Sequence, residues 1–203
     1  MTGRATLRGD IGAVAIGASA GGIQALSVLL PALPAEAAVA VFIVLHLPRN
    51  RPSLLAEVFS RKCLLDVREA QDKEPVIAGT VYCAPANYHL LVEHGPNLAL
   101  SVDEPVHHSR PSIDVLFESA AEVYRNRLLG IILTGANQDG AQGLAAVHDA
   151  GGITVAQTPE LAQSPKMVIS AIKVRQPDHV LSLDNIAALL SALPTAAVAR
   201  RSR

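Results

Sequence analysis

The chain alternates short apolar runs with longer segments in which apolar residues recur at helical spacing. The runs of strand length are apolar on both faces, which is typical of buried parallel strands. They cover residues 13–16, 39–45, 80–84, 128–133 and 154–156, and the helix-period segments cover residues 22–30, 53–61, 112–124, 142–150 and 184–193. Alternation of this kind predicts an α/β fold with a doubly wound, mostly parallel sheet flanked by helices.

One stretch departs from the alternation. Residues 89–92 and 97–101 are two short strand-like runs joined by Glu93-His94-Gly95-Pro96, which predicts an antiparallel β-hairpin at one edge of the sheet. No repeat or low-complexity tract interrupts the remaining chain. We therefore expect one catalytic domain over residues 13–193, with an N-terminal tail at 1–12 and a C-terminal tail at 194–203.

Composition fits this fold and narrows the classes of function. Half of the 203 residues are hydrophobic but only 3% are aromatic, and the formal net charge is −1. Such a charge provides no field that would attract nucleic acid or an anionic membrane. No apolar stretch reaches the roughly 20 residues that cross a bilayer. Cys63 and Cys83 lack the spacing of a metal site or redox pair, so we expect a cytoplasmic protein with reduced thiols and without membrane insertion.

Polar residues directly after the predicted strands are the candidates for chemistry, because ligands of an open α/β sheet bind beyond the carboxyl ends of its strands. The first strand is followed by the segment Gly17-Ala18-Ser19-Ala20-Gly21-Gly22. Its small residues allow a tight turn that exposes the Ser19 hydroxyl. A helix that begins at Gly21 or Gly22 offers unpaired backbone N–H groups, so we expect Ala20 and Gly21 to support an oxyanion beside a nucleophilic Ser19.

This glycine-rich turn has other readings. Such turns also bind dinucleotide phosphates, but that fingerprint requires Gly in place of Ser19 and an acidic residue after the second strand, where His46 stands instead. A purely structural turn is a second alternative. Gly17-Ala18-Ser19-Ala20-Gly21 also matches the elbow of α/β-hydrolases, but those enzymes place several strands before the elbow and run serine, acid, histidine along the chain.

A histidine and an aspartate complete the candidate set. Among seven histidines, only His46 directly follows a strongly apolar parallel strand, which puts its imidazole at the same edge as Ser19. Asp139 lies in a Gly-flanked loop after the strand that ends at Leu133, and it is also a candidate N-cap of the helix that follows. Asp103 with the neighbouring His107 and His108 lacks a supporting second motif for a metal site. We expect neither a metal nor a cofactor.

With these segments together, the chain resembles the catalytic domain of the chemotaxis protein-glutamate methylesterases (CheB-type) over residues 12–193. The matching motifs are collinear, which makes the resemblance specific. They are Ile16-Gly17-Ala18-Ser19-Ala20-Gly21-Gly22, Leu45-His46-Leu47-Pro48, Gly79-Thr80-Val81-Tyr82-Cys83-Ala84-Pro85, Tyr88-His89-Leu90-Leu91-Val92, Arg110-Pro111-Ser112-Ile113-Asp114-Val115-Leu116-Phe117, Ile132-Leu133-Thr134-Gly135, Asp139-Gly140-Ala141 and Gly151-Gly152.

The resemblance implies a Ser-His-Asp triad on Ser19, His46 and Asp139. Its implied reaction is the hydrolysis of γ-glutamyl methyl esters on the cytoplasmic helices of methyl-accepting chemoreceptors, with release of methanol. Ala136 stands where the family usually has the Met of Gly-Met-Gly, so its backbone N–H is implied in the oxyanion hole. Arg49 and Arg51 follow His46 and are candidates for contact with an acidic receptor helix, or else face solvent.

Classical members of the family also carry an N-terminal phosphoacceptor domain, and residues 1–12 are too few to form one. The resemblance therefore implies a stand-alone form or a fragment, for which a separate response regulator is a candidate partner. Two alternatives to the esterase stay open. The same triad would deamidate receptor glutamines, and a catalytically silent binding module in a chemosensory complex would use the fold without the chemistry.

Overall fold

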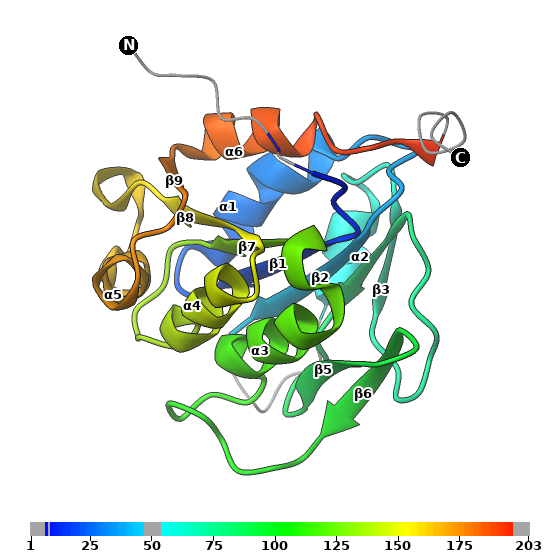
Figure 1. Ribbon diagram of the computed structural model, residues 1–203, viewed down its shortest axis with the longest axis horizontal. Coiled ribbons are helices and arrows are strands. Elements are labelled where there is room, and N and C mark those ends of the chain that lie inside the picture. The colour runs from blue at the N-terminus through cyan, green and yellow to red at the C-terminus, as the bar shows by residue number, and fades with distance from the viewer. Residues whose placement is uncertain (1–6, 8, 47–53, 197–203) are drawn as a thin grey trace.

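A sheet of seven parallel strands forms the centre of the computed structural model, which describes residues 7, 9–46 and 54–196 (Figure 1). The strand order is β3-β4-β2-β1-β7-β8-β9, and it reverses direction along the chain at β1. The predicted doubly wound, parallel fold is therefore confirmed. The strands are β1 (Ala13–Ala18), β2 (Ala40–Leu45), β3 (Asp66–Glu69), β4 (Thr80–Cys83), β7 (Leu128–Ile132), β8 (Ile153–Gln157) and β9 (His179–Leu181).

Helices cover both faces of the sheet. Alternate strand residues point to opposite sides, and because both sets are apolar, each face is buried under helices. In β1, Val14 and Ile16 pack toward α1, α2 and α6, whereas Ala13 and Ala15 pack toward α3, α4 and α5. The α-helices are α1 (Gly22–Leu29), α2 (Leu55–Ser60), α3 (Ile113–Tyr124), α4 (Ala141–Asp149), α5 (Lys166–Val174) and α6 (Leu183–Leu190). Short 3₁₀ turns occur at η1 (Leu30–Ala32), η2 (Arg125–Arg127) and η3 (Pro159–Leu161).

The predicted hairpin is present as β5 (His89–Glu93) and β6 (Asn97–Ser101), which form a separate two-stranded antiparallel sheet. Leu90 and Leu98 are buried in the same apolar cluster as α3, and the backbone N–H of Val92 donates to the hydroxyl of Ser119 on that helix. The hairpin is thus held by packing on α3 and adds no strand to the large sheet.

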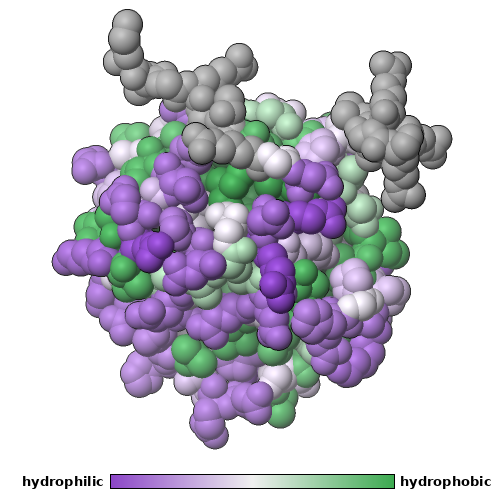
Figure 2. Space-filling model, viewed as in Figure 1, coloured by the Kyte–Doolittle hydropathy of each residue, from purple (hydrophilic) through white to green (hydrophobic). Residues whose placement is uncertain are grey.

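The solvent side of this layer is mostly polar. Figure 2 shows hydrophilic residues predominating on the face that carries α3 and α4, with hydrophobic ones interspersed, as expected of helices that turn their apolar sides to the sheet. The packed body extends to the buried Ile11 at one end and to Thr195, which bridges to Ala37, at the other. None of the described helices is long and apolar enough to cross a membrane.

Small residues on β1 bring α3 close to the sheet at the end where β1 stops. A Cβ atom on Gly17 would lie only 2.3 Å from Cγ2 of Ile113, the first residue of α3. Glycine is therefore required for this approach. Its effect is to place the N-terminus of α3 beside the turn that holds Ser19.

Candidate active site

A pocket of about 430 Å³ lies at the carboxyl ends of the central strands. Ser19 directly follows β1 and His46 directly follows β2, and both line this pocket. The remaining lining comes from Asn137, on the loop after β7, and from residues 107–111 of the loop between β6 and α3. The structure therefore brings together residues that the sequence places at three separate strand ends.

His46 is fixed by a buried carboxylate. Its Nε2 atom lies 2.8 Å from Oδ2 of Asp139, and the two side chains are 13% and 0% exposed. When Nε2 carries the proton, it donates to Asp139, and Nδ1 of the neutral imidazole is left with an unprotonated lone pair. The backbone N–H of His46 donates to the carbonyl of Ala18 at 3.1 Å, which continues the β1–β2 ladder and fixes the start of the side chain.

Asp139 accepts three further hydrogen bonds, all from the N-terminus of α3. The donors are the hydroxyl of Ser112 at 2.7 Å and the backbone N–H groups of Ile113 and Asp114 at 2.7 and 3.1 Å. Burial acts to raise the pKa of Asp139, but these bonds and the one from His46 outweigh it and hold the pKa below its usual value. Asp139 is therefore ionised at neutral pH.

The helix that Asp139 caps differs from the one suggested by its position in the sequence. The interpretation of Asp139 as the N-cap of the following helix is wrong, because Gly140, with a φ of 92° and no side chain, takes the N-cap position of α4. Asp139 instead turns back to the N-terminus of α3. A carboxylate at that place is favoured by the positive end of the helix dipole as well as by the unpaired N–H groups.

Two residues without a predicted role support this arrangement. Ser112 is the N-cap of α3, and its hydroxyl oxygen also accepts from Val115 N–H. The backbone N–H of Ser112 donates to Nδ1 of the buried His89, whose Nε2 lies 3.2 Å from the carbonyl oxygen of Glu104. A Ser directly before an apolar helical segment is a sequence signal for an N-cap, so the role of Ser112 could have been predicted. His89 is a single polar residue in an apolar hairpin strand, and nothing in the sequence pattern indicates that it supports the site.

A second buried carboxylate lies next to the first. Asp114 accepts the backbone N–H of Gly143, in the first turn of α4, at 2.7 Å, and its Oδ2 lies 3.4 Å from Nε2 of His107. Burial raises the pKa of Asp114 to about 6, and the charge of Asp139 adds to the rise, while the Gly143 bond and His107 oppose it. The two helices are thus capped crosswise: Asp139, just before α4, caps α3, and Asp114, on α3, caps α4.

The turn at Ser19 leaves backbone donors available. The N–H of Ser19 donates to the carbonyl of Thr134 at 2.9 Å, and the carbonyl of Ser19 accepts Gly22 N–H at 2.8 Å. Gly21 is the N-cap of α1 with a φ of 84°, a conformation that favours glycine. Within the described part of the chain, the N–H groups of Ala20 and Gly21 have no protein acceptor.

The loop after β7 is held at both ends. Gly135 donates its N–H to the carbonyl of Ser164 at 2.9 Å, and the amide of Asn137 donates to Ser109 Oγ while its oxygen accepts Asp139 N–H. Ala136 is exposed between these two anchors. Asn137 thereby connects this loop to residues 107–111 on the other side of the pocket.

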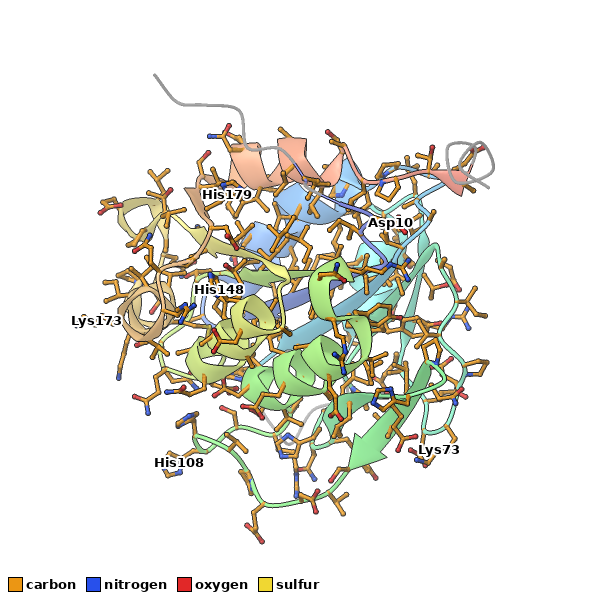
Figure 3. All side chains as sticks on the ribbon, in the orientation of Figure 1. Asp10, Lys73, His108, His148, Lys173 and His179 are labelled. Atoms are coloured by element: carbon orange, nitrogen blue, oxygen red, sulfur yellow. The ribbon has the colours of Figure 1, made fainter. Side chains whose placement is uncertain are left out.

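The remaining candidates contribute differently. Arg49 and Arg51 lie outside the described residues. His107 lines the pocket, but its ring nitrogens contact Gln138 and Asp114. Figure 3 shows His108 on the loop before α3, well apart from His148 and His179. Across the described ranges, no group of three or more His, Cys, Asp or Glu side chains is arranged to hold a metal ion.

Together these groups have the chemical types that nucleophilic hydrolysis uses. A serine that lines a pocket, an imidazole oriented by a buried carboxylate and free backbone N–H groups are what acyl transfer through a covalent intermediate requires.

Known proteins are similar to this chain in sequence and in fold. The sequence profile described as CheB methylesterase matches residues 14–190. A putative protein-glutamate methylesterase/protein-glutamine glutaminase from Leptospira interrogans is 46% identical over 177 residues, which cover 87% of this chain and 92% of that protein. A protein-glutamate methylesterase/protein-glutamine glutaminase from Symbiobacterium thermophilum is 40% identical over 86% of this chain, which spans only 48% of that longer relative. The crystal structure of the Thermotoga maritima CheB methylesterase catalytic domain superposes with a TM-score of 0.85 at 31% identity, covering 90% of this chain and 98% of that one.

Proposed function

Because this chain belongs to the CheB methylesterase family, we propose that it is a protein-glutamate methylesterase acting on the cytoplasmic helices of chemoreceptors. It would hydrolyse γ-glutamyl methyl esters to glutamate and methanol, with Ser19, His46 and Asp139 as the triad. The observation that carries the proposal is the 2.8 Å hydrogen bond between His46 and the buried Asp139, beside the pocket that Ser19 and His46 both line.

In the acylation step, Ser19 Oγ attacks the ester carbonyl carbon while Nδ1 of His46 takes the hydroxyl proton. The ionised Asp139 stabilises the imidazolium that results. The negative charge that develops on the carbonyl oxygen is stabilised by the backbone N–H groups of Ala20 and Gly21, with Ala136 as a further donor.

Collapse of this intermediate breaks the bond to the methoxy oxygen. His46 returns its proton to that oxygen, so methanol leaves and Ser19 stays bound to the glutamyl group as an ester. A water molecule then attacks the same carbonyl carbon while His46 accepts its proton. The bond to Ser19 Oγ breaks as His46 returns this proton to Oγ, which releases the glutamate side chain and restores the free serine. No metal or cofactor has a role in this scheme.

The test compares the protein with its Ser19→Ala variant on receptor membranes premethylated with a labelled methyl group. Release of labelled methanol by the protein, and none above background by Ser19→Ala, is the expected result. No release by either protein, together with a Ser19 that does not react with a fluorophosphonate, would favour the binding-module alternative and overturn the esterase proposal.

Glutamine deamidation is a second candidate, favoured by the names of the relatives, which combine methylesterase with protein-glutamine glutaminase. The same three residues would serve, with His46 protonating the amide nitrogen so that ammonia leaves in place of methanol. Ammonia release from receptor membranes that carry glutamine at the modified positions tests it directly. A separate response regulator as partner would be shown by activity that depends on adding the phosphorylated regulator.

A further inference from the structure

We infer that Thr134 is a positioning residue for the oxyanion donors: its hydroxyl fixes the peptide unit after Ala20, so that the N–H of Gly21 stays available beside Ser19. The inference rests on the proposed function, because it assigns a role in the same site. Thr134 lies two residues after β7 and is only 2% exposed.

Every polar group of Thr134 is engaged. Its carbonyl accepts the N–H of Ser19 at 2.9 Å, and its own N–H donates to Oε1 of the buried Gln157 at 2.9 Å. Its hydroxyl oxygen lies 2.8 Å from the carbonyl oxygen of Ala20 and 3.3 Å from that of Ser164, and it accepts Ser164 N–H at 2.9 Å. The shorter contact makes Ala20 the main acceptor of the hydroxyl proton.

The geometry of the peptide unit links these contacts to the direction in which the N–H groups of Ala20 and Gly21 point. A trans peptide unit is planar, with its C=O and N–H on opposite sides. Because the carbonyl of Ala20 points to Thr134, the N–H of Gly21 in the same unit points away from it. In the preceding peptide unit, the carbonyl of Ser19 points to Gly22, whose N–H it accepts. The N–H of Ala20, in the same unit as that carbonyl, therefore points away from Gly22.

The Ala20–Gly21 unit needs this restraint more than most. Gly21 already has a φ of 84°, and glycine occupies both signs of φ without steric cost, so the chain itself does little to resist rotation of the unit. A rotated unit would present the carbonyl oxygen of Ala20 where a donor is required. A hydroxyl that binds this oxygen from the buried side removes that alternative.

The methyl group of Thr134 has a separate role, which permits a clean comparison. A Cβ on Gly21 would lie 3.1 Å from Thr134 Cγ2, so the methyl packs against the turn. Thr134→Val removes the hydroxyl and keeps the shape, whereas Thr134→Ser keeps the hydroxyl and removes the methyl. If the hydroxyl positions the donor, only the valine variant loses function.

Thr154 offers a matched structural control. It is 1% exposed on β8, its hydroxyl donates to Asp178 Oδ2 at 2.7 Å, and it accepts Asp178 N–H at 3.0 Å. Thr154 lies near the amino end of its strand, away from the carboxyl ends that form the site. Thr154→Val therefore removes the same kind of buried hydroxyl, and a comparable amount of stability, without touching the turn.

The experiment measures the rate at which a fluorophosphonate labels Ser19, together with kcat and KM for methanol release, in the full chain. Thr134→Val should be labelled about 100-fold more slowly, with kcat lowered to a similar extent and KM little changed. Thr134→Ser and Thr154→Val should stay close to the unmodified protein. If the valine variant folds poorly, Thr134→Ala, which cannot clash, replaces it.

Labelling of Thr134→Val at the unmodified rate would overturn the inference, and so would an equal slowing in Thr154→Val. Failure of the proposed function is seen in the unmodified protein, which would release no methanol from receptors. A Ser19 that is still labelled would then indicate a hydrolase with another substrate, and an unlabelled Ser19 would indicate a binding module and overturn this inference as well. The two hypotheses are therefore separable, because labelling requires the turn and the triad but not the receptor.

Discussion

At the scale of single residues, the carboxylate of Asp139 has no acceptor capacity to spare. Its Oδ2 accepts hydrogen bonds from Nε2–H of His46 and the N–H of Ile113, and its Oδ1 accepts from the hydroxyl of Ser112 and the N–H of Asp114. An amide of the same shape can accept at only one of its two atoms. The negative charge and the two-sided acceptor are therefore both needed here.

Asp139→Asn should consequently lose about four orders of magnitude in methanol release, because His46 loses its orienting carboxylate. It should also lose about 1–3 kcal/mol of unfolding free energy, since buried donors are left unpaired. The measurements are single-turnover methanol release and urea unfolding. Asp114→Asn is the control for a buried carboxylate nearby, and an equal activity loss in that variant would argue against a specific role for Asp139.

Asp114 also predicts how stability depends on pH. Its pKa is raised from 3.8 to about 6, so the folded chain holds this proton more tightly than the unfolded chain does. The stability that results is fully present below about pH 4 and is lost as the pH rises through about 6.

Asp114→Asn removes this dependence, because an amide oxygen can still accept Gly143 N–H without carrying a charge. Relative to the unmodified protein, the variant should gain stability between pH 4 and pH 8, by at most on the order of 3 kcal/mol. Urea unfolding at both pH values measures the gain. The pKa of Asp139 is held below its usual value, so Asp139 stays largely ionised over this pH range, and an equal difference at the two pH values would contradict the prediction.

At the scale of elements, the N-terminus of α3 supplies three of the four donors to Asp139. Ser112→Ala removes one of these donors and the N-cap together, and should cost about 1–2 kcal/mol of stability. Ser182→Ala is a matched control, because Ser182 caps α6 by accepting Asn185 N–H and contacts no catalytic candidate. Both variants should be destabilised, but only Ser112→Ala should lose methanol release. Full activity in Ser112→Ala would show that the two backbone donors suffice.

The elements that the sequence predicted are those with a strong apolar pattern. The five strands predicted for the parallel sheet, the two of the hairpin and all five predicted helices have counterparts, but β3, β9 and α5 were not anticipated. In β3, charged Asp66, Arg68 and Glu69 surround one apolar residue, as suits an edge strand, and β9 has only three residues. The sequence of α5 contains two Val and two Ile in nine residues, a composition that does not separate helix from strand without its packing.

The candidate site divides in the same manner. The residues that follow strand ends were found because ligands of a parallel sheet generally bind at the carboxyl ends of its strands. Ser19, His46 and Asp139 indeed lie there. Their catalytic roles stay predictions. The partners of Asp139 were out of reach, because Ser112 is 27 positions away in sequence and only the packing of α3 on β1 brings it near.

At the scale of the whole molecule, the position of the α3–α4 layer on the sheet determines the geometry of the site. Gly17→Ala would place a methyl group 2.3 Å from Ile113 Cγ2 and force α3 outward. We expect a loss of about 1–3 kcal/mol and a marked fall in methanol release, since the donors of Asp139 move with the helix.

Gly12→Ala, just before β1 at its amino end, is the control. The atoms nearest to its new methyl group belong to the guanidinium of Arg127, the closest at 3.0 Å, and this flexible side chain can move away. Thermal unfolding and methanol release should stay near those of the unmodified protein. A Gly17→Ala variant that behaved like Gly12→Ala would mean that the layer adjusts without consequence for the site.

Because α3 and α4 cap each other crosswise, the distance between these helices reports whether the donors on α3 are in place to hold Asp139 beside His46. Movement of α3 away from α4 would separate Asp139 from its donors on α3 and Asp114 from Gly143 at the same time. A pair of spin labels on the solvent sides of α3 and α4 would therefore read out the integrity of the site in the resting protein. Such a distance, recorded without any receptor, would distinguish variants that misplace the carboxylate from variants that only weaken substrate binding.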